Sequence, residues 1–325
     1  MKNNYFIALR TKPMGKLEKR SKGLAPLNLS KVKGNILLFD TETIGDITKG
    51  EKAFPYDVSF INIFKREITH KIAYINKNIY DNEYLMNNAF YKNKIPFYNE
   101  KLKTDSNYKK VNDKELLLNL NKFIKDNKIK YFLAFNVKFD YNSINNLYDK
   151  VGIKNEFKKL RLIDIWKIAT DMLEMFKPLY ESYMLFCYRN NYITESGKNV
   201  KTSAEIFNRW VNNDLNFIEN HTGLEDTFCE YNILLKLLWY YEKQTGESYY
   251  YKLDSVFSPS GKIFQNGIFN TERLEPIKRK YRLTIFYLIK TVYLCSEHIK
   301  QIKSYGKNYK ATVASLSCVT RSRSY

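Results

Sequence analysis

Cysteine and histidine are both scarce in this chain of 325 residues, which holds four cysteines and three histidines. The cysteines (Cys187, Cys229, Cys295 and Cys318) form no CxxC pair and lie far apart in the sequence. This spacing suggests neither a zinc ribbon nor a disulfide framework, and it favours a reduced, cytoplasmic setting. The first ten residues lack the apolar core of a secretory signal. Residues 281–295 are too short and too charged to span a membrane, so we expect a core-facing or partner-facing amphipathic helix there and no membrane association.

Several familiar catalytic signatures are also missing. The sequence has no GxxxxGK[ST] motif, no GxGxxG after a strand, no GxSxG and no HExxH. These absences exclude a phosphate-cradling NTPase and a serine hydrolase. Carboxylates at the ends of expected strands remain as candidates for chemistry.

Positive charge is abundant, and it is concentrated at the two ends of the chain. The formal net charge is +20. Residues 1–35 carry nine Lys and Arg against one acid, and residues 276–325 carry eleven against one, so the middle is nearly neutral. Basic arms of this kind suit a polyanionic partner such as nucleic acid. The alternative is that basic tails maintain solubility or reflect a Lys-rich genome.

Strand-like and helix-like segments alternate through the middle of the chain. Strands are expected at 35–40, 56–64, 71–75, 130–135 and 160–165, and helices at 115–127, 141–151, 203–211 and 224–244, with a further helix beginning at Trp166. The last of the four helices shows an apolar stripe that we expect to be buried, formed by Leu224, Phe228, Tyr231, Leu235 and Trp239. Residues 76–112 show no periodicity and are expected to form a long insertion or lid-like loop. This pattern predicts an α/β domain over 33–246, between a basic arm at 1–32 and a basic, partly helical extension at 247–325.

Two carboxylates lie at the end of the first expected strand, in the segment LLFDTET, if that strand extends over 36–42. Asp40 and Glu42 are two residues apart, so their side chains project from the same face of a strand. Neighbouring carboxylates repel one another unless a cation lies between them, and oxygen ligands suit Mg²⁺ or Mn²⁺. The alternative is a solvated loop after a buried strand.

Two further candidates lie at expected helix starts. Asp140 follows a strand and begins a helix, where ligands bind in open α/β sheets, although an Asp there can equally be an N-cap. His221 precedes a helix that carries Asp226. A surface histidine, beside acids that favour the helix dipole, is the alternative for this pair.

The acids and the histidine occur in a set order: DxE, then NxxFD, then HxxxxD. In this order LFDTET, AFNVKFD and HTGLEDTFCE resemble the three motifs of the DEDDh branch of the DnaQ-like 3′–5′ exonucleases, over about 33–246. KTSAEIFNRW and FIENHTGLED are similar to exonucleases encoded by phages of Gram-positive bacteria. One departure is Phe135, at a position where family members often carry His.

The resemblance implies a fold, a reaction and a set of site residues. The fold is a ribonuclease H-like mixed sheet of about five strands flanked by helices. Asp40, Glu42, Asp140 and Asp226 would hold two divalent cations, Mg²⁺ or Mn²⁺, with His221 as general base and Thr41 and Asn136 at the substrate.

The expected activity is removal of nucleoside 5′-monophosphates from the 3′ end of a strand, with single-stranded DNA favoured. Two alternatives stay open: an RNA exonuclease of the same branch, and a non-catalytic module that binds nucleic acid or a polymerase. Any polymerase or replication protein would act in trans as a partner.

Overall fold

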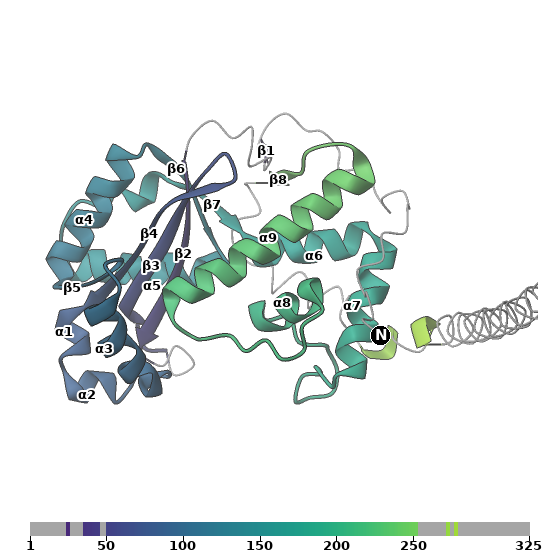
Figure 1. Cartoon of the computed structure of the whole chain (residues 1–325), viewed down its shortest axis with the longest axis horizontal. Helices are drawn as coiled ribbons and strands as arrows, with labels where there is room; N and C mark the ends of the chain where they lie inside the picture. The colour runs from purple at the N-terminus through teal and green to yellow at the C-terminus, as the bar shows by residue number, and fades with distance from the viewer. Residues whose placement is uncertain (1–23, 27–34, 46–49, 253–270, 274–275, 279–325) are drawn as a thin grey trace, which may run out of the picture. The chain divides into compact units, whose positions relative to one another are not determined.

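The computed structural model describes residues 24–26, 35–45, 50–252, 271–273 and 276–278 (Figure 1). The chain divides into two compact units, Met1–Thr271 and Glu272–Tyr325, and the first contains the candidate site. The helix expected at 281–295 lies outside the described residues. Within the described part of the chain, no helix is both long and apolar enough to cross a membrane.

A six-stranded mixed sheet forms the centre of the first unit, with the strand order β5-β4-β3-β2-β6-β7. Its strands are β2 (Asn35–Ile44), β3 (Phe54–Phe64), β4 (Glu67–Asn76), β5 (Tyr108–Val111), β6 (Ile129–Ala134) and β7 (Arg161–Asp164). β3 runs antiparallel to both of its neighbours, and the remaining pairs are parallel. The predicted mixed sheet flanked by helices is confirmed, with six strands where about five were expected.

The helices of this unit are α1 (Lys77–Tyr80), α2 (Glu83–Met86), α3 (Ile95–Thr104), α4 (Asp113–Asp126), α5 (Val137–Val151), α6 (Ile165–Met175), α7 (Lys177–Arg189), α8 (Ala204–Asn212) and α9 (Gly223–Thr245). The helices expected at 115–127, 141–151, 203–211 and 224–244 are confirmed as α4, α5, α8 and α9, and the helix from Trp166 as α6. The sequence did not predict α7.

The expectation of a lid-like loop at 76–112 is wrong, because this segment contains α1, α2, α3 and β5, whereas the alternative, that it is an insertion, stays a prediction. α1 and α2 have four residues each, about one turn, so no hydrophobic period can develop in them. Asparagines cap both: Asn76 accepts a hydrogen bond from the Asn78 N–H, and Asn82 accepts one from the Leu85 N–H.

The two faces of the sheet pack against different helices. Leu37 and Phe39 of β2 belong to a core that also contains Leu116 and Leu120 of α4 and Ile144 of α5. α9 packs on β2 and β3, and Figure 1 shows this long helix crossing the sheet. Because side chains alternate along a strand, the even-numbered residues of β2 face α9 rather than the core beneath α4 and α5.

The apolar stripe predicted for α9 is partly wrong. Phe228 and Trp239 are 38% and 46% exposed, whereas Leu234 and Leu237 are fully buried. The buried side of the helix also carries acids, since Asp226 is only 5% exposed. The apolar stripe in the sequence therefore predicted the wrong buried face for part of α9, because acidic side chains of this helix face the sheet.

A second, two-stranded sheet joins segments from the two flanks of the predicted exonuclease domain. β1 (Leu24–Pro26) pairs antiparallel with β8 (Tyr250–Lys252), with Leu24 opposite Lys252. The boundaries predicted at residues 33 and 246 stay predictions.

Candidate active site

The first two acids are positioned by β2, the central strand that pairs with both β3 and β6. Asp40 lies opposite Ser59 and Glu42 opposite Asp57 of β3. The register shifts between Glu42 and Thr43, so the pairing is irregular beside the second acid and resumes with Thr43 opposite Pro55. Glu42 is 8% exposed, while Asp40 is half-buried. Both acids therefore lie within a strand, with Glu42 buried and Asp40 half-buried, and the solvated loop proposed as the alternative does not form.

The third acid lies on α5 and is held against β2 by hydrogen bonds. Asp140 is in the first turn of α5, and its Oδ1 accepts hydrogen bonds from the Thr41 N–H at 3.0 Å and the Thr41 hydroxyl at 2.9 Å. Asn136, and not Asp140, occupies the N-cap position of α5. Asn136 has φ of +64°, its N–H donates to Asp164 Oδ1 at 3.2 Å, and its side chain is exposed. Thr41 is buried against Asp140 and Ser143.

The fourth acid and the histidine come from the start of α9. The Thr222 N–H donates to Asp226 Oδ2 at 3.0 Å, which closes the first turn and orients the carboxylate. His221 has φ of +52°, a left-handed conformation that persists only where the surroundings enforce it. Its side chain is 31% exposed.

Buried Asp57 of β3 anchors this helix start. Its Oδ2 accepts hydrogen bonds from the Gly223 N–H at 2.9 Å and the Tyr98 hydroxyl at 2.8 Å, and Oδ1 accepts one from Ser59 at 2.5 Å. A Cβ on Gly223 would lie 2.9 Å from the Ser59 Cβ, so only glycine permits this close approach. Asp57 therefore places His221 and Asp226 over β2.

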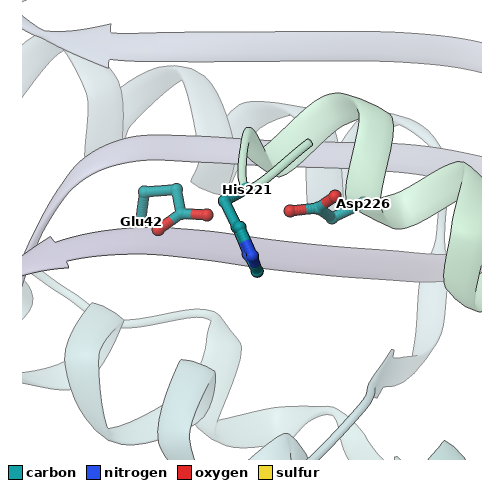
Figure 2. A group of neighbouring side chains, drawn as sticks. All are labelled: Glu42, His221 and Asp226. Carbon is teal, nitrogen blue, oxygen red and sulfur yellow. The ribbon is translucent and has the colours of Figure 1, made fainter. Parts of the chain in front are cut away.

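Together these elements bring three of the predicted residues into direct proximity, while Asp40 and Asp140 lie outside this group but near enough to repel its acids. One ligand atom each of Glu42, His221 and Asp226 lie within 4.8 Å of one another, and Figure 2 shows His221 between the two carboxylates. Glu205, Glu219 and His221 form a second such group. Carboxylate and imidazole groups at this separation suit a divalent cation.

Burial and mutual repulsion dominate the electrostatics of the acids. Burial, followed by the charge of Asp140, raises the pKa of Asp40 well above its usual value. Burial and then Asp226 do the same to the pKa of Glu42. Burial raises the pKa of Asp140 to about 7, and burial with the charge of Glu219 raises that of Asp226 to about 8. Four carboxyls this unfavourable in their charged form fit a site built for cations.

No basic side chain compensates these acids within the described part of the chain. None of the ion pairs found there joins a Lys or Arg to Asp40, Glu42, Asp140 or Asp226. Burial lowers the pKa of His221, which favours a neutral imidazole able to accept a proton.

Sequence reasoning missed two acids at the site. Glu230 lies one helical turn after Asp226, is 3% exposed, and has no hydrogen-bond partner for Oε2. Burial, followed by the charge of Asp140, raises its pKa well above the usual value. Glu219 Oε2 lies 4.0 Å from His221 Nδ1, and burial followed by the charge of Glu205 raises the pKa of Glu219 to about 7. The four-residue spacing from Asp226 was the available signal for Glu230.

An aromatic side chain at the site was also missed. The rings of Tyr91 and His221 stack with centroids 4.0 Å apart and planes 8° from parallel. Tyr91 belongs to the segment expected to be a loop, where no sequence period marked it.

No protein-family model and no curated protein sequence matches the chain significantly. Solved structures similar to it include E. coli exonuclease I in complex with a dA16 oligonucleotide, at 13% identity and a TM-score of 0.41, covering 66% of this chain and 42% of that chain. An apo exonuclease I structure has 13% identity and a TM-score of 0.42, with coverage of 66% and 43%. The zinc-bound form of the E. coli ExoI–ssDNA complex has 12% identity and a TM-score of 0.40, with coverage of 66% and 42%. The chain spans about two fifths of the length of these proteins, and the functional assignment rests on the geometry of the site.

Proposed function

We propose that this chain is a metal-dependent 3′–5′ exonuclease that releases nucleoside 5′-monophosphates, with single-stranded DNA as its preferred substrate. The observation that supports this most directly is the grouping of Glu42, His221 and Asp226 within 4.8 Å of one another. Asp40 and Asp140 are near enough to repel these acids, and no acid of the site has a basic partner among the described residues.

The residues present fit two divalent cations, Mg²⁺ or Mn²⁺. Asp40, Glu42, Asp140 and Asp226 would hold them, and the raised pKa values show how unfavourable these carboxylates are without positive charge nearby. When bound, the cations lower the pKa of a water molecule and offset the negative charge of the phosphodiester.

The histidine has a role of its own. A neutral His221 accepts the proton of the attacking water, and the nearby carboxylate of Glu219 stabilises the imidazolium that results. Thr41 holds Asp140 in place through two hydrogen bonds, and the exposed side chain of Asn136 lies at the start of α5, where the substrate strand can reach it.

Degradation of 5′-labelled single-stranded DNA and RNA of one sequence tests the proposal, with Mg²⁺, with Mn²⁺ and with EDTA. The expected result is a ladder of DNA products that shortens from the 3′ end and is absent in EDTA. Preferential degradation of RNA would contradict the proposed preference for DNA but would support the proposed 3′–5′ exonuclease reaction. Folded protein that binds both strands and degrades neither would favour the non-catalytic module.

A further inference from the structure

The segment Asn88–Lys94, between α2 and α3, runs along the candidate active site. Ala89 forms a β-bridge with Ile44, two residues beyond Glu42, and is only 5% exposed. Two residues later, the ring of Tyr91 covers one face of the His221 imidazole. Backbone pairing and ring stacking thus fix this segment to the site at two points.

Phe90, between these two points, has the opposite environment. Its side chain is 85% exposed, the highest value among the large exposed apolar side chains of the described residues. The ring meets Tyr91 edge to face, with centroids 4.8 Å apart and planes 82° from parallel. Because Met86 and Ala89 are buried, the exposure of Phe90 does not result from a segment that lacks packing.

A positive charge lies at the end of the same segment. Lys94 lies three residues after Tyr91, immediately before α3, and no ion pair of Lys94 is found within the described residues. The segment therefore offers an exposed aromatic ring and an ammonium group beside a group of acids. This is the combination that binds a single strand, because bases stack on aromatic rings and phosphates pair with cations.

We propose that Phe90 is a stacking platform for a base near the 3′ end of a single-stranded nucleic acid, with Lys94 facing its backbone. Tyr91 packs against the ring of Phe90 and stacks on His221, so it holds the platform at a fixed position relative to His221. The platform reads no base identity, since every base presents a flat aromatic face. This inference rests on the proposed function, because it describes how the same site binds its substrate.

Binding to the full chain with the substitution Asp226→Asn, which is expected to stop hydrolysis, tests the platform. The probes are DNA oligonucleotides that carry 2-aminopurine at the last, second-last or third-last position, in Mg²⁺. Stacking quenches the fluorescence of one of these probes on the parent protein. Phe90→Ala is expected to remove the quenching and weaken binding about tenfold, whereas Phe90→Tyr keeps both.

Trp239→Ala is the matched control. Trp239 is also an exposed aromatic residue, but it lies thirteen residues after Asp226 on α9, about 20 Å along the helix. This variant should bind as the parent does. An independent measurement uses the active protein: Phe90→Ala should raise KM about tenfold with little change in kcat, and the melting temperature should be unchanged because the ring is exposed.

Two outcomes would overturn the platform. If Phe90→Ala retains the parent's affinity, quenching and KM, the ring does not contact substrate, although the exonuclease assignment stands. If neither the wild-type chain nor the Asp226→Asn protein binds any probe, and no degradation occurs, the proposed function and the platform fail together.

Discussion

At the scale of single residues, the candidate site brings together several acidic side chains, most of them buried. Asp226 is the acid whose removal separates binding from chemistry most cleanly, because its carboxylate lies beside both Glu42 and His221. We expect Asp226→Asn to reduce hydrolysis more than about 100-fold, the upper loss for residues that only support a ligand. Affinity for a single-stranded oligonucleotide should change little. Degradation rate and fluorescence anisotropy measure the two quantities.

Glu67→Gln is a suitable control for that substitution, since Glu67 is an exposed acid at the start of β4. It should leave both rate and affinity unchanged. Full activity in Asp226→Asn would mean that the site has been assigned to the wrong residues.

Glu230 gives a second prediction for a single side chain. Its pKa is raised above the ordinary value by burial, so the folded protein binds a proton there more tightly than the unfolded chain does. Wild-type stability therefore falls as pH rises above about 4.5, and Glu230→Gln removes this loss. The melting temperature of the metal-free variant should exceed that of wild type, by a margin that grows between pH 4.5 and pH 7. If the difference in melting temperature between Glu230→Gln and wild type is the same at pH 4.5 and pH 7, the pKa of Glu230 is not raised in the folded protein.

At the scale of elements, the position of α9 decides whether the site exists. Gly223→Ala would place a Cβ 2.9 Å from Ser59 and 3.1 Å from Asp57, and it would push the helix start away from β3. Overpacking of this kind destabilises by about 1–3 kcal/mol. The shift also displaces His221 and Asp226, so we expect a loss of activity larger than the loss of stability explains. Denaturant unfolding and degradation rates test this.

Lys236→Ala provides the comparison on the same helix, because Lys236 is exposed. It should affect neither stability nor activity beyond a few tenths of a kcal/mol. If Gly223→Ala behaves like Lys236→Ala, the close approach of α9 to β3 is not needed for the site.

The sequence predicted some elements well, for physical reasons. Five strands and the long helices show apolar alternation or a helical period, and the order of the three motifs brought out the acids and His221. Single-turn helices such as α1 and α2 have no period to detect, and β5 has only four residues. Glu230 and Tyr91 depend on tertiary contacts, which no local pattern encodes. The stripe on α9 misled because the buried face carries acids along with leucines.

At the scale of the whole molecule, stability should depend on pH in the direction opposite to that of proteins with salt-bridged acids. The folded-state pKa values of Asp57, Asp140 and Asp226 are raised to about 6, 7 and 8, above the unfolded value near 3.8. The folded protein then binds more protons than the unfolded chain between these values, so its stability falls as pH rises from about 4 to about 8.

Thermal unfolding in EDTA at pH 5, 6, 7 and 8 measures this decline. Mg²⁺ or Mn²⁺ should offset it, with a larger gain in melting temperature at pH 8 than at pH 5, because cations bind the deprotonated acids. A metal-free protein that becomes more stable between pH 5 and pH 8 would contradict the buried, unpaired acids.

The pairing of Leu24–Pro26 with Tyr250–Lys252 has a consequence for the chain between them. Adjacent strands are about 4.8 Å apart, so the polypeptide enters and leaves the span 27–249 at nearly the same point. A unit whose entry and exit coincide can be spliced into a surface loop of a host protein without stretching either partner. Such an insert must include both β1 and β8. If one of the two strands is deleted, the backbone hydrogen-bonding groups of the other lose their partners.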